Sequence, residues 1–109
     1  MQTSLRNKVQ LIGNVGNAPD IIVFENDKKV ARFSIATNES YVNLKGEKIT
    51  TTDWHSLVVW GKLADVVEKH VSKGKEVAVQ GKLTYRNYED SNGDKKSITE
   101  IVVNELLLL

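Results

Sequence analysis

The sequence predicts a small, mostly β protein: a closed barrel of five strands with one helix between the third and fourth strands. Three observations lead to this prediction. Apolar and polar residues alternate over most of the chain, as they do in strands with one buried face. A single segment, 62–74, changes to the spacing of an amphipathic helix. The length of 109 residues is typical of one domain, and we expect a single domain over 1–109.

Before the helix, the pattern predicts three strands. Residues 8–15 mix alternation with a short apolar run and are followed by turn residues. Residues 21–40 contain two extended runs around a polar hairpin turn, and one face of the second run carries Ala31, Phe33, Ile35 and Thr37. We interpret 41–53 as a polar loop with Gly46 at its tip. Residues 54–61 are rich in β-branched and aromatic residues, and we interpret them as a strand.

The helix and two further strands complete the chain. One stripe of the helix is expected to pack: Leu63, Val66, Val67, His70 and Val71. Residues 76–88 return to alternation, with Gly81 at a position typical of a bulge. Asn92-Gly93 predicts a hairpin turn before a last strand over 97–109. The oligonucleotide/oligosaccharide-binding (OB) barrel has this order of elements, and its closure protects the strand edges.

Composition excludes several classes of function. The chain has 15 basic and 14 acidic residues and a net charge of +1, so a site for a polyanion must come from local arrangement. It has no cysteine, which excludes disulfides and thiolate metal sites and fits a cytoplasmic location. No apolar stretch approaches the roughly 20 residues of a membrane span. We therefore predict no membrane association, no metal and no cofactor.

The two tryptophans raise the main functional question. Trp54 and Trp60 lie an even number of residues apart, so on a strand they share a face, while His55, Leu57 and Val59 share the other. We expect the second set to point inward and the two indoles to point outward. Packing in the core and burial in a dimer interface remain as alternatives for both indoles.

Aromatic planes with cations between them are what a groove for single-stranded nucleic acid requires, because bases stack and phosphates are negative. On the strand over 76–88, the even positions are mostly polar and carry Arg86 next to Tyr88, which indicates a solvated face. Ordinary surface roles remain open for each of these residues. The candidates for base stacking are Tyr41, Trp54, Trp60 and Tyr88, and those for phosphate contact are Lys8, Lys62, Lys73, Lys82 and Arg86.

The same residues carry a family resemblance. The segments NKVQLIGNVGNAPD, FSIATNESY, TDWHSLVVWGKLADVVEKHVSKGKEVAVQGKLTYRNYED and TEIVVNELLLL resemble the bacterial single-stranded DNA-binding proteins (SSBs). The resemblance implies an OB barrel that assembles as a homotetramer, a dimer of dimers. It also implies binding of single-stranded DNA without sequence preference, in replication, recombination and repair. By this resemblance the four aromatic residues stack bases, Lys62, Lys73, Arg86 and Lys8 contact the DNA backbone, and His55, Val9 and Leu11 lie near subunit contacts.

The chain differs from well-known SSBs in two respects. Tyr41 and Tyr88 stand where those proteins have tryptophan, and Trp60 stands where they have phenylalanine, so each position stays aromatic. SSBs also carry a flexible polar linker and an acidic C-terminal tip that recruits replication and repair enzymes, whereas this sequence ends at Leu109. We therefore expect such protein partners only for a chain that carries the tail.

Two other functions are compatible with a small barrel. An enzyme would need a catalytic or metal-binding constellation, but His55 and His70 lie on faces expected to pack, and no metal-ligand spacing occurs. We therefore do not expect an enzyme. A protein-interaction barrel, such as a dimeric primosomal relative of SSB, would bury the same aromatic residues against a partner.

Overall fold

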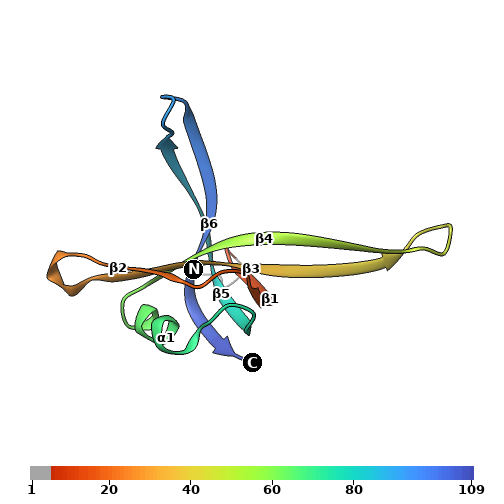
Figure 1. Cartoon of the computed structure of the whole chain (residues 1–109), viewed down its shortest axis with the longest axis horizontal. Coiled ribbons are helices and arrows are strands. Elements are labelled where there is room, and N and C mark those ends of the chain that lie inside the picture. The colour runs from red at the N-terminus through yellow and green to blue at the C-terminus, as the bar shows by residue number, and fades with distance from the viewer. Residues whose placement is uncertain (1–5) are drawn as a thin grey trace.

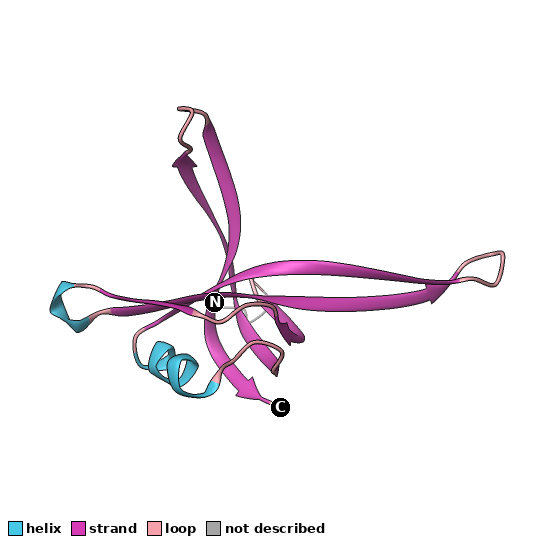
Figure 2. Cartoon of the chain, viewed as in Figure 1, coloured by secondary structure: helices cyan, strands magenta, loops and turns pink. Residues whose placement is uncertain are grey.

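The structure of the protein is a computed structural model, which describes residues 6–109. Strands make up most of these residues, and α1 is the one α-helix among them (Figures 1 and 2). The strands are β1 Val9–Val15, β2 Asp20–Val23, β3 Lys29–Val42, β4 Lys48–Trp60, β5 Glu76–Glu89 and β6 Lys95–Leu108. The helices are the short 3-10 helix η1 Glu25–Asp27 and α1 Lys62–His70.

Five strands close into a barrel. They lie in the order β1-β5-β6-β4-β3, and β1 meets β3 again at Asn14 and Val15. β4 and β6 run parallel where they pair at Leu57 and Val58 of β4. β2 forms a hairpin with β3 and extends the sheet beside it. The predicted five-stranded OB barrel, with its helix between the third and fourth barrel strands, is confirmed.

The inward side chains of the strands form the core, because alternate residues of a strand point to opposite faces. Leu57 and Val59 of β4 are buried, as predicted, and Ile35 of β3 packs into the same cluster. α1 adds Ala64 and Val67 to this cluster. Burying a side chain of the size of valine or leucine contributes about 1.5–3 kcal/mol, so the inward set holds the strands in register.

Besides the β2–β3 hairpin, two longer hairpins project from the barrel in different directions (Figure 1). We call them the β3–β4 arm (38–52) and the β5–β6 arm (87–97). The expectation that 41–53 forms a loop was wrong, because only 43–47 lie outside the strands, with Gly46 in the turn. In a two-stranded ribbon each strand pairs one backbone edge with its neighbour and exposes the other edge to water, so the ribbon forms without an apolar face, and the β-branched run ITTT in β4 favours extended backbone.

The irregularity expected near Gly81 is present. The register of β5 against β6 shifts between Gln80 and Gly81, and Asn104 is the extra residue on β6. A Cβ at Gly81 would lie 2.1 Å from the carbonyl oxygen of Val102, so the two backbones approach more closely than a side chain permits. At the tip of the β5–β6 arm, Gly93 has a φ of +82°, in the turn that Asn-Gly predicts.

α1 is attached to β3 by ion pairs. Lys29 Nζ lies 2.6 Å from Asp65 Oδ1 and 2.7 Å from Glu68 Oε1. Hydrogen bonds to Asp65 and Glu68 raise the pKa of Lys29. The hydrogen bond from Lys29 lowers the pKa of Asp65. Both ion pairs therefore stabilise the contact between the helix and the barrel.

The last turn of α1 differs from the prediction. Val67 and Val71 of the expected stripe are buried, and Leu63 is half-buried, but His70 is exposed. The helix ends at His70, and the extended backbone at Val71 returns the valine side chain to the core while the imidazole of His70 stays exposed. The expectation that His70 packs was therefore wrong.

Candidate nucleic-acid interface

The outer surface of the barrel over β3, β4, β5 and β6 carries the aromatic and basic residues, and we call it the binding face. On β4, Trp54 and Trp60 are 62% and 46% exposed, while Leu57 and Val59 point into the core. The predicted division of this strand is confirmed, and packing of the indoles in the core is wrong. Val58 also has the outward parity, but its side chain is buried, and β3 and β6 pair with β4 on either side of it.

The edge of the Trp54 ring lies against the chain at Gly16. A Cβ at Gly16 would lie 2.2 Å from Cζ3 of the indole, so only glycine lets the ring approach the backbone here. The segment is fixed by Asn17, whose Oδ1 accepts hydrogen bonds from Ser34 N–H at 3.0 Å and from Ser34 Oγ at 2.7 Å. The edge of the indole is therefore held against this segment, and most of the ring stays exposed.

Trp60 stacks on Phe24, which the sequence analysis did not select. The ring centroids are 6.0 Å apart and the planes differ by 20°. Phe24 follows β2, and its N–H donates to the carbonyl oxygen of Lys28 across the hairpin. The β2–β3 hairpin in the sequence could have indicated this contact, because it places Val30 beside Trp60 and so brings Phe24 near the end of β4.

An arginine–glutamate–arginine cluster occupies the middle of the binding face. Glu100 of β6 has a side chain only 8% exposed. Its Oε2 accepts a hydrogen bond from Arg32 Nη1 at 2.6 Å, and its Oε1 accepts one from Arg86 Nε at 3.2 Å. The three residues line one hollow together with Ser34, Ser56 and Asp20. Arg86 was a predicted phosphate contact, whereas Arg32 and Glu100 were not selected.

Tyr88 lies beside Arg86 as the sequence indicated. The guanidinium carbon of Arg86 is 5.7 Å from the centroid of the Tyr88 ring, within the range of a cation–π contact. Tyr88 is exposed on the β5–β6 arm, and Lys82, also exposed, has the same outward parity on β5. Arg86, Tyr88 and Lys82 therefore follow one line along the binding face.

The remaining candidates lie apart from this line. Tyr41 is exposed on the β3–β4 arm, where the unbroken register gives it the opposite parity to Trp54. Lys8 precedes β1, Lys62 begins α1 and Lys73 follows α1, and all three are exposed. Within residues 6–109, these three lysines and Lys82 make no salt bridge with a carboxylate, which leaves their charges available.

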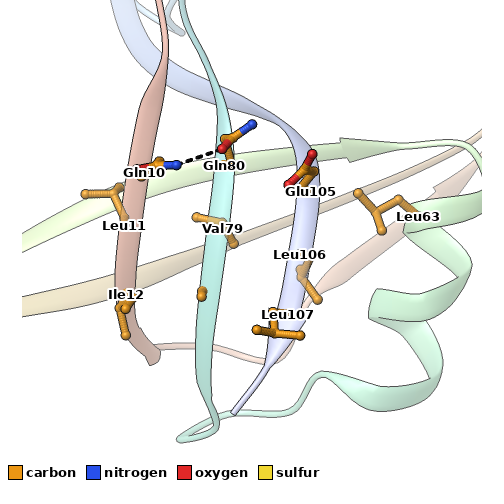
Figure 3. A pocket seen from close by; sticks show the side chains of 10 residues that line it. Gln10, Leu11, Ile12, Leu63, Val79, Gln80, Glu105, Leu106 and Leu107 are labelled. Carbon is orange, nitrogen blue, oxygen red and sulfur yellow. Dashed lines mark hydrogen bonds between the residues drawn. The ribbon is translucent and has the colours of Figure 1, made fainter. Parts of the chain in front are cut away.

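A second outer surface lies over β1, β5 and β6. Ile12, Ala78 and Leu107 form one row across the three strands, and Gln10 Nε2 donates to Gln80 Oε1 at 2.8 Å in the next row (Figure 3). Ile12 and Leu107 are exposed, and the rows line a shallow hollow. We call Ile12, Ala78 and Leu107 the apolar row.

The three residues expected near subunit contacts have different positions. Val9 and Leu11 point inward and pack half-buried against the core. Their strand, β1, pairs with β3 only at Asn14 and Val15, so its other residues have one backbone edge without a strand partner within the described chain. His55 is half-buried, with Nε2 2.9 Å from Thr37 Oγ1.

Fold and surface together define a class. A closed five-stranded OB barrel whose outer face carries open aromatic rings and guanidinium groups is an oligonucleotide-binding type of barrel. The model of the single-strand binding protein family matches residues 6–109, and the chain belongs to that family. The resemblance noted in the sequence is thereby confirmed, and the family is one of binding proteins rather than enzymes.

Individual relatives agree with this assignment. The chain is 39% identical over 104 residues to single-stranded DNA-binding protein 1 of Chlorobaculum tepidum, covering 94% of this chain and 64% of the relative. It is 33% identical over 103 residues to the single-stranded DNA-binding protein of Neisseria meningitidis, covering 94% of this chain and 59% of the relative. The chain thus spans about three-fifths of the length of these relatives.

A solved structure shows the same fold. A chain from the structure "Plasmodium falciparum SSB complex with ssDNA" superposes with a TM-score of 0.88 at 39% identity, over 100% of this chain and 99% of that one. Within residues 6–109 of the present protein, no helix is long and apolar enough to cross a membrane.

Proposed function

We propose that the protein binds single-stranded DNA without sequence preference. The exposure of Trp54 and Trp60 on the outer face of β4, beside the two arginines around Glu100, carries this proposal. A base stacked on an aromatic ring contributes on the order of 1–3 kcal/mol whatever the base, and Lys and Arg neutralise phosphates. A surface with both groups binds a strand through features that every sequence shares.

In this proposal the rings and the cations have separate tasks. Trp54, Trp60 and Tyr88 stack bases along the barrel and the β5–β6 arm, and Tyr41 stacks a base that reaches the β3–β4 arm. Support comes from the relatives, which are single-stranded DNA-binding proteins, and from the Plasmodium SSB, which was solved with ssDNA. The proposed phosphate contacts are Lys8, Lys62, Lys73, Lys82 and Arg86.

Titration with oligo-dT tests the proposal. Trp54 and Trp60 are the only tryptophans of the chain, so base stacking on them is expected to quench most of the intrinsic fluorescence. Trp54→Ala and Trp60→Ala should each weaken binding about 5- to 150-fold, the range that corresponds to one lost stack. A duplex of the same length serves as the control ligand, because its bases are already paired and stacked.

The protein-interaction alternative gives a different result. If the aromatic residues serve only a protein partner, a large excess of oligo-dT leaves the fluorescence unchanged. If either Ala variant unfolds instead of losing affinity, the indoles stabilise the barrel rather than bind DNA. The first outcome would reject the proposed function, and the second would reject base stacking on that indole as its source.

The proposal includes a homotetramer built as a dimer of dimers. The backbone edge of β1, free of a strand partner over most of its length, can pair with β1 of a second copy, which would place Val9, Leu11 and His55 near the contact. The apolar row is a surface that a two-fold axis can bury against itself, because such an interface joins the same patch on both copies. These two surfaces give the two different contacts that a dimer of dimers needs.

Light scattering tests the assembly. The wild type is expected to have the mass of four chains at micromolar concentration, and Ile12→Glu should reduce it to two chains. Ile22→Glu is the matched control, because Ile22 is also an exposed isoleucine but lies on β2, away from the apolar row. A wild type with the mass of one chain would reject the tetramer.

The biological setting follows from the ligand. Single strands arise in replication, recombination and repair, and we propose that the protein covers and protects them there. Recruitment of replication and repair proteins is proposed only for a chain that continues beyond the barrel with an acidic tail.

A further inference from the structure

Within residues 6–109, Glu100 is the one buried charged residue, and it lies in the middle of the binding face. It points outward from β6 and pairs with Thr84 of β5, whose Oγ1 donates to the Glu100 carbonyl oxygen at 3.3 Å. A carboxylate at this place repels DNA phosphates. Its presence on this surface therefore needs an explanation other than the electrostatic attraction of DNA.

The geometry around the carboxylate supplies one. Arg32 reaches Glu100 from β3 and Arg86 reaches it from β5, so the two guanidiniums meet the carboxylate from different strands. The arginine side chains are 34% and 48% exposed, whereas that of Glu100 is 8% exposed. A guanidinium has five N–H donors, and each arginine donates one hydrogen bond to Glu100, so most donors stay open to a ligand.

Arg86 also connects the cluster to an aromatic ring. Its Nε is bound by Glu100 while its guanidinium lies over the ring of Tyr88. Long arginine side chains lose substantial rotamer entropy when a ligand orders them, and a side chain that is already held loses less. Glu100 thereby orders a cation and, through it, the neighbourhood of a proposed stacking ring.

We propose that Glu100 is a positioning residue for DNA binding, which holds Arg32 and Arg86 where they meet DNA phosphates. This proposal rests on the proposed function. It has an unusual consequence: neutralising Glu100 makes the binding face more positive but weakens binding. A carboxylate that serves only the stability of the fold would not have this effect, because its removal would leave the arginines free to bind phosphate.

Glu100→Gln is the direct test, with Asp20→Asn as the matched control. Asp20 lines the same hollow and pairs with Arg32 across β2 and β3, but it is exposed and makes no salt bridge within the described chain. Both variants raise the net charge by the same amount. We expect Asp20→Asn to bind oligo-dT as tightly as the wild type or up to about threefold tighter, since a phosphate-repelling charge is lost.

Glu100→Gln should bind oligo-dT about tenfold more weakly, because charge-assisted hydrogen bonds to both arginines are lost. The slope of log K against log salt should also fall by about 0.7 for each phosphate contact that is lost. A purely structural role changes the melting temperature without changing this slope. Anisotropy of labelled oligo-dT at several salt concentrations gives both quantities.

A second variant keeps the test independent of folding. Glu100→Asp keeps the charge but is one methylene shorter, so it cannot reach both arginines, and we expect a reduced slope at unchanged net charge. Wild-type affinity and slope in Glu100→Asp would overturn the proposal. So would a Glu100→Gln protein that binds as tightly as Asp20→Asn. If the wild type itself fails to bind oligo-dT, the proposed function fails first, and this inference fails with it.

Discussion

Gly16 supports the Trp54 ring, and replacing it with alanine is a small change with a calculable effect. The added Cβ would lie 2.2 Å from Cζ3 and 2.9 Å from Cη2 of the indole. Carbon atoms pack at about 3.5–4.0 Å, so the ring has to move by more than about 1 Å. Trp54 is exposed, so it can move without opening the core, and the fold is expected to stay within about 0.5 kcal/mol of the wild type.

The expected cost falls on binding. A base stack is worth on the order of 1–3 kcal/mol, and a displaced ring keeps part of it. We therefore expect Gly16→Ala to lose ~0.7–1.4 kcal/mol of binding free energy, which is about three- to tenfold in Kd. Anisotropy of labelled oligo-dT is the suitable assay, because the substitution itself alters tryptophan fluorescence.

A double-mutant cycle decides whether the effect passes through Trp54. In a Trp54→Ala background, the ring that collides with the new methyl group is gone, so Gly16→Ala should have no further effect on Kd. An equal loss of affinity in both backgrounds would refute the reasoning. Unchanged affinity in the single variant would refute it as well.

Three further predictions follow from contacts within the barrel. Phe24→Ala should weaken oligo-dT binding about two- to fivefold by anisotropy, since the stacked pair that fixes Trp60 is worth roughly 0.5–1 kcal/mol; wild-type affinity contradicts this. Gly81→Ala should lower the free energy of unfolding in urea by about 1–3 kcal/mol through overpacking against β6, and an unchanged unfolding midpoint contradicts it. Asp65→Asn should lower the melting temperature near neutral pH, because the hydrogen bond from Lys29 lowers the pKa of Asp65. The ion pair stabilises the fold above the ordinary pKa of 3.8 and is lost as the pH falls further, so the melting temperatures of the two proteins should converge in acid. A difference in melting temperature that stays constant down to acid pH contradicts the assignment.

Much of the fold was predictable because buried apolar residues recur at a regular spacing along each strand and helix. The inward set of β4, the helical stripe that ends in Val71, and the close approach at Gly81 each follow from local spacing or residue type. The β3–β4 arm was not predictable in this way. Its strands pair with each other but cover no core, so 41–53 carry no apolar period and were interpreted as a loop.

The binding face was predictable only in part, for a related reason. Parity identified Trp54, Trp60 and Arg86, because each alternates with core residues on its own strand. Phe24 and Glu100 act across strands, and their partners lie at distances in sequence that no local pattern encodes. The signal for Glu100 was a carboxylate with outward parity directly before the apolar run 101–103 of β6, and it gains meaning only when the strand order is known.

The stacking of Phe24 on Trp60 also decides how bases can be arranged on that indole. Gly16 contacts only the edge of the Trp54 ring, whereas the ring of Phe24 stacks on one side of Trp60. Trp60 therefore has a single open side, so it can receive one base but cannot intercalate between two. A strand held at this ring keeps its bases on one side of the indole, without the ring wedged into its base stack.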